Sequence, residues 1–289
     1  MAAENAGAHA PTAGEYIQHH LQHLQMNFSF EGVKQTSIVD FSLFNLDSVF
    51  FSLVLGVIGC IVLWAAARKA TSGVPGRFQA AVEILSEMVE NQAKGVIHNA
   101  KSRKLISPLA LTVFVWIFLM NAMDMLPVDL IPAAWHAAGP ALGFKDYMRV
   151  VPTADLSTTL GLSCSVLFIC LVYNIKIKGL GGWAHELIAA PFGDHWALWP
   201  VNFLMQMIEY LAKTVSHGMR LFGNMFAGEL VFMLIALMGG GWALSATGVG
   251  LAIGHVIAGT VWTLFHILVI TLQAFIFMML TLIYTGQAH

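Results

Sequence analysis

Four charged residues lie inside a stretch that is otherwise apolar, residues 197–238: Glu209, Lys213, Arg220 and Glu229. A charge in the middle of a membrane-spanning helix costs about 2.5–3.5 kcal/mol on insertion scales, so such residues usually pair or carry ions. Lys213 lies near one end of the stretch and can extend to the lipid headgroups. Arg220 lies deeper. Its fixed positive charge favours the ionised form of a nearby carboxyl group.

Helical periodicity sorts these residues onto two faces. At about 100° per residue, the positions within roughly 40° of Arg220 form one polar stripe with it: Glu209, Lys213, Ser216 and Asn224. Glu229 points about 180° away and lies about 13 Å further along the axis. One helix is therefore predicted to present a mainly cationic stripe to one neighbour and a carboxylate to another region.

The following apolar segment carries a second polar stripe. His255, His266 and Gln273 are separated by eleven and seven residues, which places them within about 20° of one another on a helix. Histidine titrates near neutral pH and exchanges protons with a carboxylate. We therefore expect Glu229 to face His266 in a proton relay, whereas His255 is equally well explained as an ordinary packed histidine.

Polar residues earlier in the chain are candidates for an outer vestibule. Asp124, Arg149 and Asp155 lie at or near the ends of apolar segments, and Asp47 lies at the mouth of the first of them. For Asp47 the simplest expectation is a helix N-cap, because carboxylates accept hydrogen bonds from the first free N–H groups of a helix.

The sequence predicts neither a metal site nor a cofactor. A histidine group near the N-terminus lacks the cysteines or acids that would complete a zinc site, and we expect it on an amphipathic helix: His19, His20 and His23. The three cysteines lie in apolar runs without CxxC spacing and are expected to behave as small hydrophobic residues.

Composition shows which kind of protein must position these residues. Of 289 residues, 57% are hydrophobic and 10% charged, and the mean hydropathy is +0.73, whereas soluble domains carry about 25% charged residues. The solvent of this chain is therefore largely the lipid bilayer. A net charge of −2 without a basic face argues against nucleic acid as a partner.

The order of apolar segments predicts an all-α membrane protein with five crossings. The expected spans are residues 48–67, 105–123, 156–175, 197–238 and 250–285, with an amphipathic surface helix at 78–97. The last two would be about 63 and 54 Å long as straight helices, roughly twice the hydrocarbon thickness, so they must tilt steeply, bend or lie partly along the membrane. We expect the run Gly239 to Gly241 to provide the turn of this helical hairpin.

Basic residues predict how the chain is oriented in the membrane. Nine of the fourteen cations fall in two regions on one side: Arg68, Lys69, Arg77, Lys94, Lys101, Arg103, Lys104, Lys176 and Lys178. The positive-inside rule makes that side cytoplasmic, with the N-terminus outside and the C-terminus inside. We divide the chain into an outer N-terminal segment (1–46), three spans with the surface helix (47–196) and the tilted hairpin (197–289).

The motifs that carry these residues resemble subunit a of the bacterial F-type ATP synthase. The resemblance rests on SHGMRLFGNMFAGEL (216–230) and FHILVITLQAFIFMMLT (265–281), and on NLDSVFFS (45–52), KATSGVPG (69–76), PLALTVFVWIFLMN (108–121) and RVVPTAD (149–155). It implies a non-catalytic stator of a proton channel in the bacterial inner membrane, with a periplasmic N-terminus. Its implied partners are a rotating ring of c subunits, each with a buried carboxylate, and the b subunits of the peripheral stalk.

The resemblance also implies roles for individual residues. Arg220 corresponds to the stator arginine, with Asn224 on the same face, and a further group corresponds to the polar residues of two offset aqueous half-channels and the a–c interface: Glu229, His266 and Gln273. Bacterial members often have an acid at the position of Gln206, and Glu209 here replaces a small polar residue. We therefore infer that Glu209 serves the inner half-channel.

Two other classes of membrane protein remain open at this stage. In a haem-binding redox subunit, His217, His255 or His266 would ligate iron, although paired axial histidines normally face one macrocycle. A proton-coupled secondary transporter would show inverted repeats and a substrate pocket at the membrane midplane. Neither inverted repeats nor such a substrate pocket is visible in the sequence.

Overall fold

The computed structural model describes residues 13–21, 23–27, 40, 42–71, 73–127, 130–131, 135, 149–240 and 245–287. Within these ranges, five helices are long and apolar enough to cross a membrane: α2 (Leu46–Arg68), α4 (Ala100–Ala122), α6 (Leu156–Ala189), α7 (Trp199–Gly240) and α8 (Ala246–Gly286). Short 3₁₀ turns adjoin them at Met123–Met125, Pro152–Ala154 and Trp196–Leu198. The prediction of an all-α protein with five candidate spans is confirmed.

Helix α3 (Arg77–Val96) matches the expected amphipathic helix. Val89, Ala93 and the following Ile97 are buried in the core shared with α4 and α8, whereas Ile84 and Phe78 remain exposed. The helix thus buries one part of its apolar face against the protein and leaves the other part open, as a helix at a membrane surface does.

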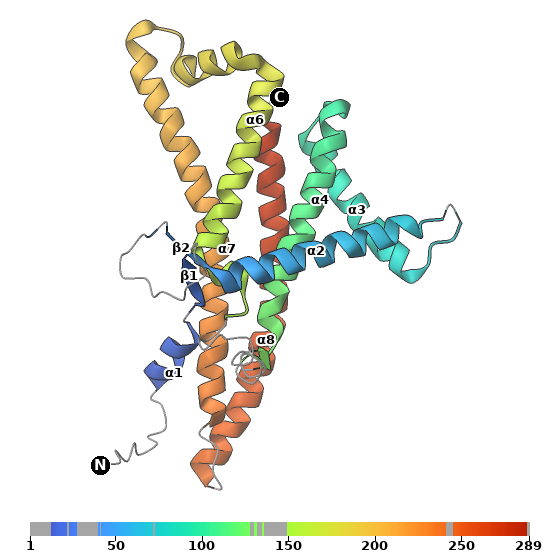
Figure 1. The fold of residues 1–289 in the computed structure, drawn as a ribbon, viewed down its shortest axis with the longest axis vertical. Coiled ribbons are helices and arrows are strands. Elements are labelled where there is room, and N and C mark those ends of the chain that lie inside the picture. The colour runs from blue at the N-terminus through green and yellow to red at the C-terminus, as the bar shows by residue number, and fades with distance from the viewer. Residues whose placement is uncertain are drawn as a thin grey trace.

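Helix α6 is broken at Gly179, whose φ of 73° and ψ of 161° are open to glycine and strained for other residues. The break follows Lys178, close to the expected end of the third span. Beyond it the last part of α6 turns aside and leads into α7 (Figure 1).

The hairpin of α7 and α8 dominates the molecule. With 42 and 41 residues, the two helices are each about 60 Å long, whereas the 23 residues of α2 span about 35 Å, close to the hydrocarbon thickness. In Figure 1, α2 runs across the direction of α7 and α8. If α2 crosses the bilayer directly, the hairpin lies at a steep tilt.

The turn of the hairpin differs from the expectation. Gly239 and Gly240 belong to α7, while residues 241–244 lie outside the described part of the chain. A β-carbon on Gly239 would lie 2.9 Å from Nδ1 of His255, whose Nδ1 is 2.7 Å from the carbonyl oxygen of Ile235. Gly239 therefore permits close helix packing, and His255 is a satisfied packing residue.

A small antiparallel sheet follows helix α1 (Ala13–His20) and was not predicted. Strand β1 (Gln25–Asn27) pairs with β2 (Leu43–Asn45), with Met26 opposite Phe44. Because β2 leads directly into α2, the sheet fixes part of the N-terminal segment against the start of the first span.

Candidate functional site

A buried ion pair joins α7 to the segment before α6. Nε of Arg149 lies 3.3 Å from Oε1 of Glu229, and a terminal nitrogen of the same guanidinium binds Oε2. Both side chains are buried. A fork of this kind fixes the position of the carboxylate as well as its charge.

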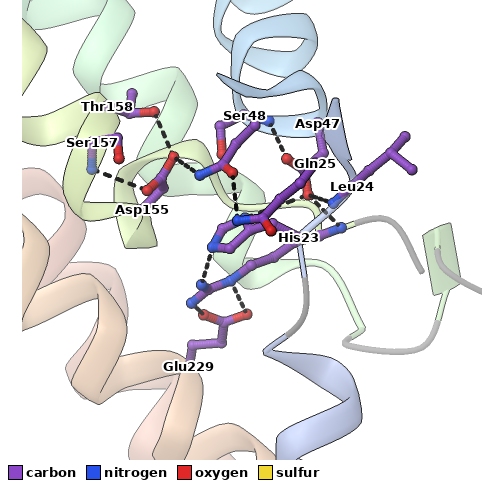
Figure 2. Close-up of polar contacts among 11 residues, drawn as sticks. His23, Leu24, Gln25, Asp47, Ser48, Asp155, Ser157, Thr158 and Glu229 are labelled. Atoms are coloured by element: carbon purple, nitrogen blue, oxygen red, sulfur yellow. Dashed lines mark hydrogen bonds and ion pairs between the residues drawn. The ribbon is translucent and has the colours of Figure 1, made fainter. Parts of the chain in front are cut away.

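A residue of the N-terminal segment, His23, contacts this ion pair (Figure 2). Nε2 of His23 lies 3.0 Å from the Arg149 guanidinium, and Nδ1 lies 3.5 Å from Oδ2 of Asp47. That oxygen also accepts hydrogen bonds from the backbone N–H groups of Leu24 and Arg149. The expectation that Asp47 is an N-cap is wrong: Asn45 occupies that position of α2, and Asp47 joins three separate segments.

Asp155, and not Asp47, caps the start of a helix. Its Oδ1 accepts from the N–H of Ser157, at the start of α6, and its Oδ2 accepts from Thr158 and from Asn45. Asp155 is itself buried. Instead of forming an open vestibule, it ties the start of α6 to the strand that precedes α2 (Figure 2).

His266 pairs with a different acid from the one expected. Its Nε2 lies 2.6 Å from Oδ2 of Asp124 in an ion-pair contact, and both side chains are almost fully buried. The expected direct contact between Glu229 and His266 is therefore wrong. The two acids instead belong to adjacent pairs, because a gap of about 20 Å³ is lined by Asp124, Arg149 and Glu229.

That gap is large enough for about one water molecule. Gly228 lies beside Glu229 and allows the His266 ring of the Asp124–His266 pair to approach α7. A β-carbon at Gly228 would overlap that ring. We call Asp47, Asp124, Arg149, Glu229 and His266 the outer cluster.

Arg220 lies apart from the outer cluster. It is half-buried and lines a small pocket with Gln273 of α8 and with His217, Leu221, Ile276 and Phe277. Within the described ranges its guanidinium has no hydrogen bond or ion pair. The Asn224 side chain donates to the backbone carbonyl of Arg220, while Ser216 is exposed.

A second polar space lies beyond Arg220 toward the start of α7. This inner cavity, of about 210 Å³, is lined by residues of α6, α7 and α8, including Gln206, Glu209, Lys213 and His217. Glu209 and Lys213 form an ion pair at 2.5 Å, and Lys213 also donates to Gln287. The predicted stripe is therefore divided: its first two charges pair with each other and leave Arg220 alone.

Apolar side chains separate the two polar regions. Leu221 and Met225 are buried on α7 between Arg220 and Glu229, and Ile270 is buried on α8 between His266 and Gln273. These apolar layers interrupt a continuous polar path between the two regions.

Sequence reasoning missed two residues of these regions. His23 was assigned only to an amphipathic face, and no periodicity links it to Arg149, 126 positions away. His217 was considered only as a haem ligand, although it lies three residues before Arg220 and close to its stripe.

Comparison with known proteins gives a consistent result. A model of the ATP synthase A chain family matches residues 49–286. The chain is 70% identical to ATP synthase subunit a of Acidovorax sp. (strain JS42), over 98% of both chains. It is also 70% identical to subunit a of Paracidovorax citrulli, over 100% and 99% of the two chains. Subunit a of Shewanella piezotolerans is 47% identical over 98% of each chain.

Proposed function

Because the chain belongs to the ATP synthase A chain family, we propose that it is the stator of the Fo proton channel, in which proton flow drives rotation of a c-subunit ring. The observation that carries this proposal is the position of Arg220: a cation inside a long apolar helix, without an ionic partner in the described structure and between two polar regions. Family membership gives no support to the haem or transporter alternatives.

Arg220 acts on a carboxyl group that the c-ring brings past it. A fixed positive charge stabilises the ionised carboxylate and so favours proton release. The same charge repels a proton that would otherwise cross directly between the two polar regions. Once past Arg220, the carboxylate is protonated again and returns to lipid as a neutral group, which avoids the cost of an intramembrane charge.

The outer cluster and the inner cavity serve as the two half-channels. Outside, Glu229, Asp124 and His266 exchange protons, with Arg149 holding Glu229 in place. Inside, Glu209 lies at the cavity where Gln206 stands in place of the acid common in bacterial relatives. Asn224 and Gln273 complete the polar surroundings of Arg220. Each proton that falls through 100 mV releases about 2.3 kcal/mol to bias rotation.

The inner cavity belongs on the cytoplasmic side of a bacterial inner membrane. Lys178, in one of the basic regions, donates to the carbonyl oxygen of Gln287 near the C-terminus, and Gly286 packs against Val96 at the end of α3. The C-terminal end therefore lies with the basic regions, as the positive-inside rule requires. Residues 1–46 are then periplasmic, and two of their described members, His23 and Leu24, contact the outer cluster.

One exposed face of α7 fits a rotor helix. Two small exposed residues, Gly223 and Ala227, lie four positions apart on this face, next to Arg220. Small residues let two helices approach closely in a membrane. The b subunits of the peripheral stalk are the other expected partners, and the largely exposed helix α2 offers them an apolar surface.

Disulfide crosslinking tests the stator assignment. In a chain whose three cysteines are replaced, Gly223→Cys should crosslink to a cysteine beside the c-subunit carboxylate, because a side chain at Gly223 meets open space. A chain that keeps only Cys60, exposed on α2, is the matched control and should not crosslink. Absence of a Gly223→Cys crosslink in the assembled complex would contradict the assignment.

A further inference from the structure

His217 is buried without a partner for either ring nitrogen. It is 2% exposed, and neither Nδ1 nor Nε2 has a hydrogen-bond partner among the described residues. Leaving a buried polar group without a hydrogen-bond partner destabilises the fold. Such a group in a native structure calls for an explanation, and a role in chemistry is one of the common ones.

The position of His217 supplies that explanation. Among the described residues, only His217 lines both the inner cavity and the small pocket that contains Arg220. The other titratable residues of the inner cavity, such as Glu209 and Lys213, do not reach the pocket of Arg220. The His217 imidazole therefore lies between the inner cavity and Arg220.

Aromatic rings hold the imidazole in this position. The centroid of Phe277 lies 3.7 Å from that of His217, and the centroid of Tyr284 lies 5.8 Å away. These contacts restrain the ring but leave its nitrogens free. A ring placed only for packing would gain nothing from the two nitrogens.

We propose that His217 passes the proton between the rotor carboxyl group and the inner cavity. This inference deepens the proposed function and rests on it. The carboxylic O–H bond breaks and the proton binds one ring nitrogen, while Arg220 stabilises the new carboxylate. The N–H bond at the other nitrogen then breaks, and this proton passes to water in the cavity or to Glu209. Imidazole is left neutral, one proton has crossed, and no electron is transferred.

Chemical rescue in the intact ATP synthase tests this step. We would measure ATP-driven proton pumping in vesicles with His217→Ala and His217→Phe, each normalised to assembled complex. Loss of a positioned proton carrier typically costs at least about a hundredfold in the step it serves, and we expect pumping to fall at least tenfold in both variants. Added imidazole should restore pumping in His217→Ala, which leaves room for it, and not in His217→Phe, whose ring fills the space.

Several results would overturn the inference. Wild-type pumping by His217→Phe would be one such result. A loss in His217→Ala that imidazole does not restore would be another, since an unrescued loss indicates a structural role. His98→Ala, at an exposed histidine after α3, should pump normally with or without imidazole. Arg220→Ala in the same vesicles separates the two proposals: if it uncouples the enzyme while His217→Phe has no effect, only the role of His217 is wrong.

Discussion

Arg149 binds both carboxylate oxygens of Glu229, a residue 80 positions further along the chain. The pair connects the segment before α6 to the middle of α7, where both side chains are buried. It therefore helps to hold the fold, and under the proposed function it also places a carboxylate at the outer end of the proton pathway. These roles can be separated by substitution.

Arg149→Leu should destabilise the protein more than the double variant Arg149→Leu/Glu229→Leu. Removing one partner of a buried ion pair leaves an uncompensated charge and costs about 3–5 kcal/mol, whereas replacing both with apolar groups is often neutral. Thermal unfolding of the purified complex measures the difference. Equal destabilisation by the single and double variants would show that the pair is not coupled.

Glu229→Gln should slow proton flux without preventing assembly. The amide keeps the size of the side chain and can still accept a hydrogen bond from Arg149, but it does not take up and release protons at neutral pH. Proton flux per assembled complex is the measurement. Wild-type flux in this variant would remove Glu229 from the pathway.

Gly228→Ala should reduce proton flux and assembly, because the added methyl group would overlap the His266 ring and displace it from Asp124. Gly250→Ala in α8 is the matched control, since its new β-carbon would meet nothing within 4 Å. The control should retain normal flux and gain up to about 1 kcal/mol of helix stability. Similar behaviour of the two variants would contradict the steric explanation.

Glu209→Gln should slow ATP-driven pumping several-fold, because it removes a proton-exchanging group from the inner cavity and leaves Lys213 without its carboxylate. Gln206→Leu, at a non-titrating position of the same cavity, should have the smaller effect. If Gln206→Leu proves the more damaging, the inner pathway does not depend on Glu209.

The sequence was sufficient to predict the spans. A run without charges, such as that from Ser48 to Ala67, has few folded alternatives in lipid, and an arginine in an apolar helix is conspicuous. The lengths of α7 and α8 also showed that neither helix could cross the bilayer upright. These predictions depend on local composition and periodicity, which a single sequence contains.

The pairing of the acids could not be predicted in the same way. Glu229 and His266 lie on neighbouring helices, and direct contact was the simplest expectation. Asp124 and Arg149 come from the ends of other segments, and their positions depend on how α4 and the segment before α6 pack against α7. His23 reaches the cluster through a small sheet that forms only when β1 meets β2, and no helical phase indicates it.

Glycines were also misread for a physical reason. A run such as Gly239 to Gly241 favours a turn, yet Gly239 serves close packing against His255 inside a continuous helix. Turn formation and close approach both require the absence of a β-carbon, so the residue type alone does not distinguish them.

The central claim is that the unpaired charge of Arg220 couples proton flow to rotation. The most direct test is ATP synthesis driven by an imposed proton gradient in vesicles that contain the intact complex with Arg220→Ala. We expect ATP synthesis to be lost while the complex still assembles and hydrolyses ATP, because nothing then favours ionisation of the rotor carboxyl group or blocks direct proton passage. Substantial gradient-driven synthesis by this variant would contradict the claim.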